Sequence, residues 1–443
     1  MRIAYIIPTP RLFTFIYNEM MEVQEGGHDL VVVPLHSAPP SKVPLRIFDR
    51  LKPEKTLPAS LCDAVIIYRA LYMFLTRPWR VLSTLLSLHW AAGLNPFAQA
   101  GVLAVTPKAL ATAWWLSHWR VQRIHAHFAS HTAACAAIAG AVSGIPFSFT
   151  AHAYDIYCTT MSLRNDTLNW KLRHATQVFA ISEHGKNLLR AKLPVADRGR
   201  VHKVYVGISM DLFQDCPPPA HDHNSELRLL CIASFDWKKG LETLIAACAL
   251  LKSHSVRFHL SLYGEGPLRE TLTDRIAGLD LTQHVKLGTP IPQEEVAKEL
   301  AACHVFVMPC RKDPKTGDMD GIPTVFMEAM ATGRPVISCQ IAGIQELVRH
   351  GETGILVHPD DPAALAGAIS RLAVNDSLRI HLGKQARVLA EQQHDQRRNT
   401  RQLLNYMTGF GSMPVRRSKN ARVAGRNQLS SGQCLPTQAP PRE

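Results

Sequence analysis

Short apolar runs alternate with amphipathic, helix-like segments along most of the chain. The runs of the first half are "RIAYIIP", "DLVVVPLH", "RIHAHF", "PFSFTAH" and "QVFAIS", and those of the second half are "LRLLCIAS", "FHLSLYG", "HVKLG", "HVFVMP" and "PVISCQ". A continuous apolar run of this length is typical of a strand that is buried on both faces. Strands and helices in alternation predict parallel sheets covered by helices. The sequence therefore predicts an α/β fold with two doubly wound parallel sheets.

A proline-rich segment separates the two sets of predicted strands. This segment, "FQDCPPPAHDHNSE", is typical of a linker. We predict an N-terminal domain over residues 1–212, the linker over 213–226 and a C-terminal domain over 227–408, followed by a basic, disordered tail over 409–443. Because ligands of open α/β sheets bind at the carboxyl ends of the strands, two facing sheets predict a cleft between the domains.

A Leu- and Trp-rich segment interrupts the alternation over about residues 45–120. It contains "YRALYMFLTRPWRVLSTLLSLHW" and "ALATAWWLSHWRVQR". We interpret it as an inserted pair of packed helices. Because Trp and Arg together favour the boundary between water and lipid, a basic surface that rests on an anionic membrane is a second interpretation, and both can hold. No uncharged apolar stretch reaches about 18 residues, so a membrane span is not expected.

The charge balance of the chain favours anionic partners. The 443 residues include 49 Lys and Arg against 36 Asp and Glu, which gives a formal net charge of +13. Nucleic acid, anionic lipid and phosphorylated substrates all fit such a charge. No helix-turn-helix, ribonucleoprotein or zinc-finger pattern occurs, so nucleic acid is not expected as a partner.

The cysteines and the N-terminus indicate a cytoplasmic protein. The ten cysteines form no C-x-x-C pair, and most lie inside apolar runs, which predicts reduced, buried thiols. The opening "MRIAYIIPTPRLF" breaks at Pro8 and has no small-residue cleavage site, so we expect a first strand rather than a secretory signal. The expected location is the cytoplasm, either free or peripheral on the inner face of the cytoplasmic membrane.

The stretch "GDMDGIPTVFMEAMATGRPVIS" carries the clearest candidate chemistry. Its pattern predicts a helix that opens at a proline, with Asp320 just before the helix and Glu328 about two turns beyond. The free N–H groups of such a helix start suit a phosphate, whereas a carboxylate suits sugar hydroxyls. A nucleotide sugar carries both groups. The residues that bracket this start are Gly321, Ile322, Pro323 and Thr324, of which Pro323 has no N–H to offer.

Other candidates follow the ends of predicted strands, where the cleft is expected. They are His152, Ser234, Gly264 and Arg311. Gly264 opens "GEGP", which is too short for a dinucleotide or P-loop fingerprint. A backbone that approaches a diphosphate and a tight strand-to-helix turn explain these glycines equally well.

The histidines of "RIHAHFASH" suggest a metal site at first sight. Strand alternation places His125 and His127 on one face, and His131 follows shortly after. No Cys or acid near them in the sequence completes a site. We therefore expect structural or acceptor-side roles for these histidines.

Taken in order, these motifs resemble the retaining glycosyltransferases of family four, which have the GT-B fold, and within them the bacterial colanic-acid-type and other exopolysaccharide glycosyltransferases. The resemblance covers roughly residues 1 to 400. It rests on "RIHAHFAS", "IPFSFTAHAYDIY", "VFAISEH", "KKGLETLI", "YGEGPLRE", "GDMDGIPTVFMEAMATGRPVIS" and "ELVRHGETGILVHPDDPAALAGAI". It implies two facing Rossmann-like domains, a UDP- or GDP-sugar donor, a lipid-linked or oligosaccharide acceptor, and retention of the anomeric configuration.

The resemblance also implies roles for individual residues. Asp320 would contact hydroxyls of the transferred sugar, and Glu328 would contact the ribose of the nucleotide. Lys239 would neutralise the charge on the departing diphosphate. His152 would contact the donor sugar, with Asp155 as a supporting group on the acceptor side. These roles make His152, Lys239 and Asp320 the expected catalytic residues.

Two further segments extend the predicted site. The loop "PTPRLFTFIYNE" resembles the acceptor-side loop of the family, shortened by about one residue, so Arg11, Thr14 and Glu19 are candidates for acceptor contacts. Asp318 and Asp320 also spell D-x-D, the metal signature of a different glycosyltransferase fold. That tripeptide is common by chance, and we expect neither a metal nor another cofactor.

The sequence departs from the family at the phosphate clamp. The family has an Arg about five residues before the position of Lys239, where this chain has Ser234. A Ser hydroxyl can bind phosphate but carries no charge, so we consider Arg311 as a substitute that reaches the diphosphate. The departure leaves two alternatives to a transferase: a catalytically weakened protein that binds sugar nucleotides, and a nucleotide-sugar epimerase on the same fold.

Overall fold

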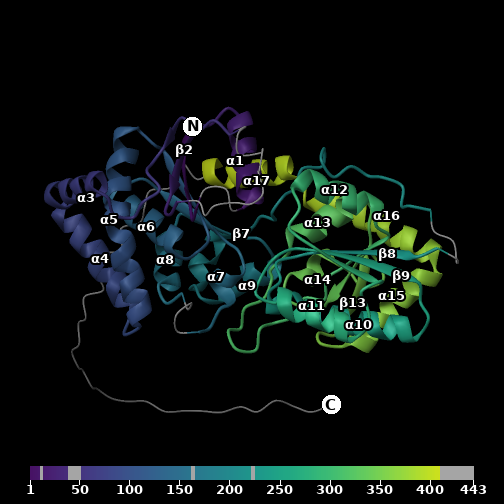
Figure 1. Cartoon of the computed structure of the whole chain (residues 1–443). Helices are drawn as coiled ribbons and strands as arrows, with labels where there is room; N and C mark the ends of the chain where they lie inside the picture. Colours follow the sequence, from purple (N-terminus) through teal and green to yellow (C-terminus); the bar gives the residue numbers. More distant parts are fainter. Residues whose placement is uncertain (10–12, 38–50, 161–164, 221–224, 410–443) are drawn as a thin grey trace, which may run out of the picture.

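The computed structural model describes residues 1–9, 13–37, 51–160, 165–220 and 225–409 (Figure 1). Within these residues the chain forms two parallel sheets that are flanked by helices. This arrangement confirms the α/β fold with two doubly wound sheets that the sequence predicts.

The first sheet contains strands from the N-terminal half of the chain. They are β1 (Arg2–Ile7), β2 (Asp29–Pro34), β3 (Lys55–Thr56), β4 (Arg123–His127), β5 (Phe147–Ala151), β6 (Gln177–Ala180) and β7 (Val201–Lys203). The strands are all parallel and lie in the order β3-β2-β1-β4-β5-β6-β7. The strand order reverses between β1 and β4, and ligands of such sheets bind at that point.

Helices connect these strands and cover the sheet. They are α1 (Thr14–Glu25), α3 (Ala64–Thr76), α4 (Pro78–Ala92), α5 (Pro96–His118), α6 (His131–Ser143), α7 (Tyr154–Tyr157), α8 (Leu168–His174) and α9 (Glu183–Ala191). The inserted segment forms the three helices α3, α4 and α5, where the sequence predicted a pair. The additional boundary lies at Pro78, which begins α4 and has no N–H to continue the hydrogen-bond pattern of α3.

The second sheet contains β8 (Leu227–Ile232), β9 (Phe258–Tyr263), β10 (Val285–Gly288), β11 (Val305–Val307), β12 (Val336–Cys339) and β13 (Gly354–Val357). Its order is β10-β9-β8-β11-β12-β13, again all parallel. The helices around it are α10 (Leu241–Ser253), α11 (Arg269–Gly278), α12 (Gln293–Ala302), α13 (Thr324–Ala331), α14 (Ile344–Leu347), α15 (Pro362–Val374) and α16 (Asp376–Gln393). The order reverses between β8 and β11, so the ends of these two strands are the expected ligand site.

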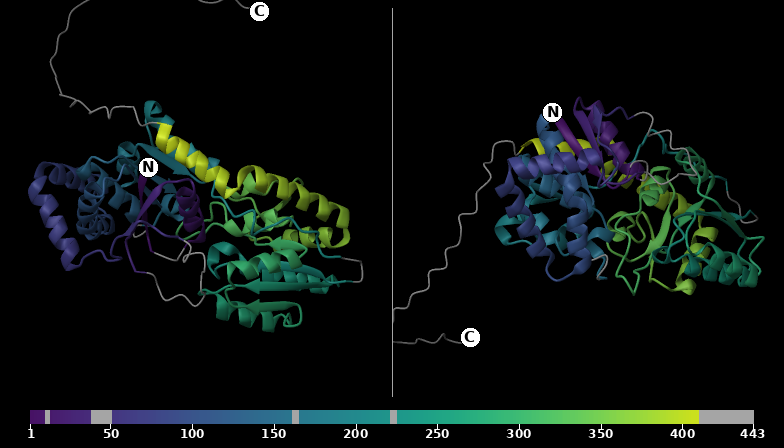
Figure 2. Two further views of the ribbon diagram at one scale, coloured as in Figure 1. Left: turned by 90° about the horizontal axis from the view of Figure 1, so that it is seen from above. Right: turned by 60° about the vertical axis from the view of Figure 1, so that its left-hand side comes forward.

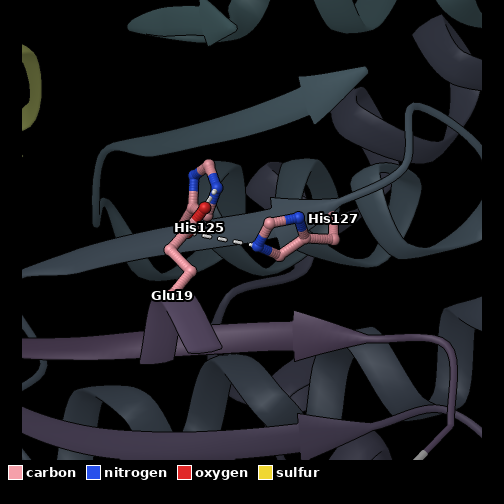
Figure 3. A group of neighbouring side chains, drawn as sticks. All are labelled: Glu19, His125 and His127. Carbon is pink, nitrogen blue, oxygen red and sulfur yellow. Dashed lines mark hydrogen bonds and ion pairs between the residues drawn. The ribbon is translucent and has the colours of Figure 1, made fainter. Parts of the chain in front are cut away.

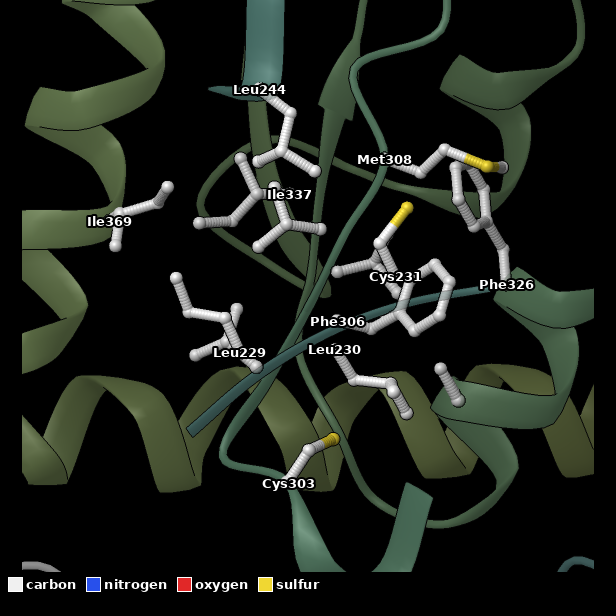
Figure 4. Close-up of a cluster of buried hydrophobic side chains, with 14 of the residues drawn as sticks. Leu229, Leu230, Cys231, Leu244, Cys303, Phe306, Met308, Phe326, Ile337 and Ile369 are labelled. Atoms are coloured by element: carbon white, nitrogen blue, oxygen red, sulfur yellow. The ribbon is translucent and has the colours of Figure 1, made fainter. Parts of the chain in front are cut away.

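The core of the second sheet explains why its strands are apolar at every position. Successive residues of β8 point to opposite faces, and helices cover both of them. Leu229 and Leu230 are each 1 % exposed, although they lie on opposite faces. Figure 4 shows them among Phe306 of β11, Ile337 of β12 and Phe326 of α13. Burial on both faces gives the continuous apolar runs seen in the sequence.

The last described helix, α17 (Gln396–Gly409), returns to the first sheet. Its residues Leu403, Leu404 and Met407 are buried in one cluster with Ile3 and Tyr5 of β1. The left view of Figure 2 shows the helix crossing toward the first sheet along one side of the molecule. The domain boundaries at 212, 226 and 408 stay predictions, and the helix at the last boundary packs with the N-terminal half of the chain.

Candidate active site

Lys239 and Asp320 form an ion pair between two loops of the second sheet. Lys239 ends a short 3-10 turn after β8, and its Nζ lies 2.7 Å from Oδ2 of Asp320. Gly240 follows with φ +64°, and a Cβ atom there would overlap the carbonyl oxygen of Pro309. Only glycine permits both this backbone conformation and this close approach. Gly240 therefore holds the turn that presents Lys239.

The electrostatics of this pair keep both groups charged. Burial lowers the pKa of Lys239, but the negative charge of Asp320 outweighs it, and the pKa lies above its usual value. Burial likewise raises the pKa of Asp320, but Lys239 and Lys238 outweigh it, and the net shift is downward. An ammonium and a carboxylate are thus both present at neutral pH, ready to bind phosphate and hydroxyl groups.

A second ion pair lies beside the first. Nζ of Lys238 lies 2.9 Å from Oδ2 of Asp318 and 3.9 Å from Oδ1 of Asp320. Both carboxylates of the D-x-D tripeptide therefore face a lysine ammonium. A neighbouring positive charge disfavours a divalent cation at these oxygens.

The predicted helix after Asp320 is α13, and it begins as the sequence indicates. Pro323 is the residue before the helix, Thr324 is its first residue, and the N–H of Phe326 donates to the carbonyl of Pro323. Glu328 is 8 % exposed, and burial raises its pKa to about 7. Its Oε1 lies 3.5 Å from Nε2 of Gln293. The helix start and the buried acid are therefore on the same short segment as Asp320.

The loop before α13 touches the first half of the chain. A Cβ atom added to Gly321 would lie 3.4 Å from Cβ of Ala153 and 3.7 Å from the carbonyl oxygen of His152. The buried side chain of Ile322 follows on the same loop. The structure thus brings the end of β5, which carries His152, against the loop of Asp320, as expected for two domains that face a common cleft.

The carboxylate of Asp155 holds the backbone at this end of β5 by hydrogen bonds. It accepts them from the N–H groups of His152, at 3.0 Å, and Ala129, at 2.6 Å. The residue is 2 % exposed, and burial raises its pKa to about 6 against the lowering effect of these hydrogen bonds. The carboxylate of Asp155 is thus bound by backbone N–H groups of the protein itself, which agrees with a supporting role. A contact of Asp155 with the acceptor stays a prediction.

A chain of polar side chains leads from α1 to His152. Oε1 of Glu19 lies 2.9 Å from the hydroxyl of Tyr5 and 3.2 Å from Nε2 of His127. Nδ1 of His127 lies in turn 3.2 Å from Nε2 of His152. Figure 3 shows Glu19 reaching from α1 toward His125 and His127 on β4. The acid beside these histidines is therefore Glu19, which is distant from them in the sequence.

The sequence does not reveal the contact between Glu19 and His127, because helix packing brings together residues that are distant in the chain. α1 packs on the sheet beside β4, which places Glu19 over residues more than a hundred positions away. The strand order of the sheet is the feature that would have predicted this contact. Because the order reverses between β1 and β4, the helix after β1 lies near the end of β4. That order is not readable from the sequence alone.

This group has two chemical uses. One ligand atom each from Glu19, His125 and His127 lies within 4.8 Å of the other two, and among the described residues this is the group that could hold a metal ion. The same contacts also form a hydrogen-bonded chain without a metal. Burial lowers the pKa of His125 to about 3 and that of His152 well below its usual value. Burial raises the pKa of Glu19, but His127, His125 and Tyr5 outweigh this and lower it.

A pocket adjoins the chain of polar side chains. Phe15, Glu19, His127 and His152 line one part of it. Tyr205 and Gly207, which follow β7, and Gln396 and Asn399 of α17 also line it. The pocket therefore lies beside His152 and reaches the last described helix, α17.

Arg311 already has protein partners at each group of its guanidinium. Its two terminal nitrogens donate to Asp360 at 2.6 Å and Glu242 at 2.9 Å, and Nε donates to the carbonyl of Trp237. The guanidinium also lies 3.4 Å from the centre of the Trp237 ring. This geometry favours a structural role for Arg311, and its contact with a diphosphate stays a prediction.

The remaining candidates occupy varied places. Ser234 is exposed on the loop after β8. Gly264 has φ +155°, and the carbonyl of its neighbour Glu265 accepts from the N–H of Phe235 at 2.8 Å, so the glycine loop packs against the loop of Ser234. Thr14 is the first residue of α1 and is half-buried. Arg11 lies outside the described residues.

Two facing parallel sheets with polar groups at the reversal points define the GT-B class of fold, and solved structures agree. HepE of Anabaena in complex with UDP aligns with a TM-score of 0.67 over 92 % of this chain and 100 % of that one, at 16 % identity. A glycosyltransferase of Rickettsia africae aligns with a TM-score of 0.67 over 93 % and 99 %, at 15 % identity. At these identities the likeness shows the fold alone.

The family follows from the sequence comparisons. Residues 14–212 match the model of Glycosyltransferase Family 4, and residues 226–375 match that of Glycosyl transferases group 1. The amylovoran biosynthesis glycosyltransferase AmsK of Erwinia amylovora is 38 % identical over 40 % of this chain and 43 % of its own length. The putative colanic acid biosynthesis glycosyltransferase WcaL of Escherichia coli is 34 % identical over 42 % and 48 %. The chain thus spans less than half the length of these relatives. The two family models, which match residues 14–212 and 226–375, show that the chain belongs to the family-four glycosyltransferases of the GT-B fold.

Proposed function

We propose that this protein transfers a sugar from a nucleotide-sugar donor to a lipid-linked or oligosaccharide acceptor in exopolysaccharide biosynthesis, with retention of the anomeric configuration. The names of AmsK and WcaL support the pathway. HepE has been solved with UDP-glucose, and a Mycobacterium tuberculosis relative, 28 % identical over 41 % of this chain, is a GDP-mannose-dependent mannosyltransferase. These relatives support a nucleotide-sugar donor and leave UDP and GDP as alternatives for the base.

The observation that carries the proposal is the 2.7 Å ion pair of Lys239 and Asp320 next to the start of α13. This pair supports the proposal because an ammonium can bind phosphate and a carboxylate can bind sugar hydroxyls. When the donor binds, Lys239 turns from Asp320 to the diphosphate, and Asp320 accepts hydrogen bonds from the sugar. The N–H groups at the start of α13 add to the positive field at the diphosphate.

The proposed reaction uses this field to stabilise the leaving group. The bond between the anomeric carbon and the diphosphate oxygen breaks, and its electron pair stays on the diphosphate, where Lys239 stabilises the charge. The acceptor oxygen forms the new bond on the same face of the sugar, and its proton passes to the departing phosphate oxygen. His152 lies on the first-domain side of the cleft, where a contact with the donor sugar orients the anomeric carbon.

A panel of UDP-, GDP- and ADP-sugars in a thermal-shift assay, with and without EDTA, tests the donor site. We expect one nucleotide class, at about a hundred times its Kd, to raise Tm by about 3 °C or more, with no effect of EDTA. Asp320→Ala and Lys239→Ala should show a clearly smaller rise. Lys252→Ala is the matched control, because Lys252 pairs with Asp280 outside the site. Failure of all three classes to raise Tm would contradict a nucleotide-sugar donor site at Lys239 and Asp320.

A further inference from the structure

The inserted helix α3 is apolar on both its inner and its outer face. Ile66 and Met73 point inward and are at most 3 % exposed. Tyr68, Leu71 and Leu75 lie on the outer side, and they are 63 %, 54 % and 68 % exposed. A helix on the surface of a soluble protein usually carries polar residues there. The outer face of α3 is therefore suited to a partner that removes it from water.

The neighbouring helix α4 extends this apolar surface. Trp79 is 82 % exposed, Leu86 is 69 % exposed and Trp90 is 87 % exposed. Helices α3 and α4 contact each other, and Figures 1 and 2 place them at the end of the molecule away from the second sheet. Exposed apolar side chains that are adjacent, rather than scattered singly, mark an interaction site. We call the surface formed by Tyr68, Leu71, Leu75, Trp79, Leu86 and Trp90 the apolar face.

The charges around the apolar face select the kind of partner. No Asp or Glu occurs between Ala64 and Tyr154, whereas three cationic residues lie on or between α3 and α4: the half-buried Arg69 and Arg77, and Arg80. Arg80 is exposed on α4. A surface that binds a basic protein partner needs acidic side chains, and residues 64–154 contain none, so such a partner is not favoured. Exposed Trp with Arg and without acids matches the headgroup region of an anionic bilayer.

The position of the apolar face also fits a lipid-linked acceptor. The turn from α4 to α5 carries Leu94, which is 101 % exposed. Next to it, Nδ2 of Asn95 donates to Asp166 at 2.5 Å, and a Cβ atom at Gly101 of α5 would lie 2.6 Å from Nε2 of His131. His131 begins α6 directly after β4, at the carboxyl edge of the first sheet. The turn thus lies at the same edge of the sheet as His127 and the pocket.

We propose that the apolar face and the exposed turn at Leu94 insert into the headgroup layer of an anionic bilayer and thereby present the first-sheet side of the cleft to lipid-linked acceptors. Membrane binding rests on the exposure and charge of these helices alone. Its use in acceptor delivery rests on the proposed function. Neither α3 nor α4 crosses the bilayer in this arrangement, in agreement with the absence of a spanning helix among the described residues.

Flotation of the full chain with vesicles tests the proposal. The two vesicle types are phosphatidylcholine alone and phosphatidylcholine with phosphatidylglycerol. We expect binding to the anionic vesicles, and we expect Trp79→Ser combined with Trp90→Ser to weaken it by about tenfold or more. Leu94→Ser is a second variant that tests the turn. The matched control is Val195→Ser with Val374→Ser, since these residues are 76 % and 70 % exposed outside the apolar face.

The outcomes separate the proposal from its rivals. Equal vesicle binding by the Trp variant and the control would overturn it, and so would an absence of binding by the unaltered chain. A dimer in light scattering that the Trp variant converts to a monomer, without vesicle binding, would assign the apolar face to a second copy instead. Trp-dependent vesicle binding without any nucleotide-sugar binding would uphold the membrane surface and refute the proposed function.

Discussion

Lys239 and Asp320 lie 81 positions apart in the chain, yet their charged groups meet at 2.7 Å. In the protein without donor each group therefore partly satisfies the other. A diphosphate that takes Lys239 away from Asp320 must compete with this carboxylate, and the sugar hydroxyls then replace the lost ammonium. The pair links phosphate binding to sugar binding.

This link predicts opposite effects of Asp320→Asn on two ligands. The free nucleoside diphosphate should bind at least as tightly as before, because the variant removes its competitor for Lys239. The nucleotide sugar should lose about tenfold in affinity relative to the diphosphate, because hydrogen bonds to a charged acceptor are lost. Calorimetric titration with both ligands gives the ratio. An unchanged ratio would show that Asp320 makes no contact with the sugar.

The chain from Glu19 through His127 to His152 predicts a defined tautomer. If Nε2–H of His127 donates to Glu19, Nδ1 of His127 must accept from Nε2–H of His152. In Glu19→Ala the acceptor is gone, so His127 should donate through Nδ1, and Nε2 of His152 should lose its proton. Nitrogen NMR of histidine-labelled protein reports this change.

The control for this experiment lies on the same helix. Glu22 is one turn from Glu19 and contacts Gln396 rather than the histidines. Glu22→Ala should therefore leave the tautomer of His152 as it is. A Glu19→Ala protein in which His152 keeps Nε2–H would contradict the relay, and a stoichiometric divalent metal in the purified protein would replace it with a metal site.

Glu328 predicts a pH-dependent stability. Its folded pKa is about 7, against a usual value of 4.5, because burial disfavours the charged form. Between these two values the folded state holds a proton that the unfolded state has released, so the free energy of unfolding falls as pH rises. The full cost, about 3 kcal/mol, is reached above pH 7. Glu328→Gln should remove this cost.

Urea unfolding at pH 5 and pH 8 measures the effect. The variant should be more stable than the unaltered chain at pH 8, whereas the two should differ far less at pH 5. Glu299→Gln is a suitable control, since the carboxylate of Glu299 accepts a hydrogen bond from the hydroxyl of Tyr263 on β9. An equal difference at both pH values would mean that Glu328 is not protonated on folding.

Substitution of Arg311 should affect the stability of the fold but not the affinity for the donor. Its guanidinium pairs with Glu242 and Asp360 and stacks on Trp237. We expect Arg311→Ala to lower the free energy of unfolding by about 2 kcal/mol, because the hydrogen bonds of the buried guanidinium are lost while the half-buried Glu242 keeps its ion pair with Arg275. Donor affinity in the folded fraction should stay within about twofold. A large loss of donor affinity with unchanged stability would instead make Arg311 the substitute for the missing Arg at position 234.

The sequence predicted the long strands well because each is buried on both faces and is therefore apolar throughout. It did not single out β3 and β7, which have two and three residues, most of them polar, and do not stand out from loops by composition. It also did not single out β13, although its residues Gly354–Val357 are buried. It also could not assign α17, because Leu403 and Met407 define an apolar face without naming the sheet that covers it.

The candidate site divides in the same way. Asp320, Glu328 and the start of α13 lie within one local pattern, and the structure places them as that pattern predicts. Glu19 and its histidine partners depend on strand order and helix packing, which no local pattern specifies. The hydrogen bonds of the Arg311 guanidinium also depend on residues that are distant in the sequence, namely Trp237, Glu242 and Asp360.

Isothermal titration calorimetry can measure the binding of UDP and GDP to the unaltered chain, to Lys239→Ala and to the control Lys252→Ala. We expect one of the two diphosphates to bind, Lys239→Ala to weaken it by about tenfold or more, and the control to bind as the unaltered chain does. Equal affinity in Lys239→Ala, or binding of neither diphosphate to the unaltered chain, would contradict a nucleotide-sugar donor site at the pair of Lys239 and Asp320.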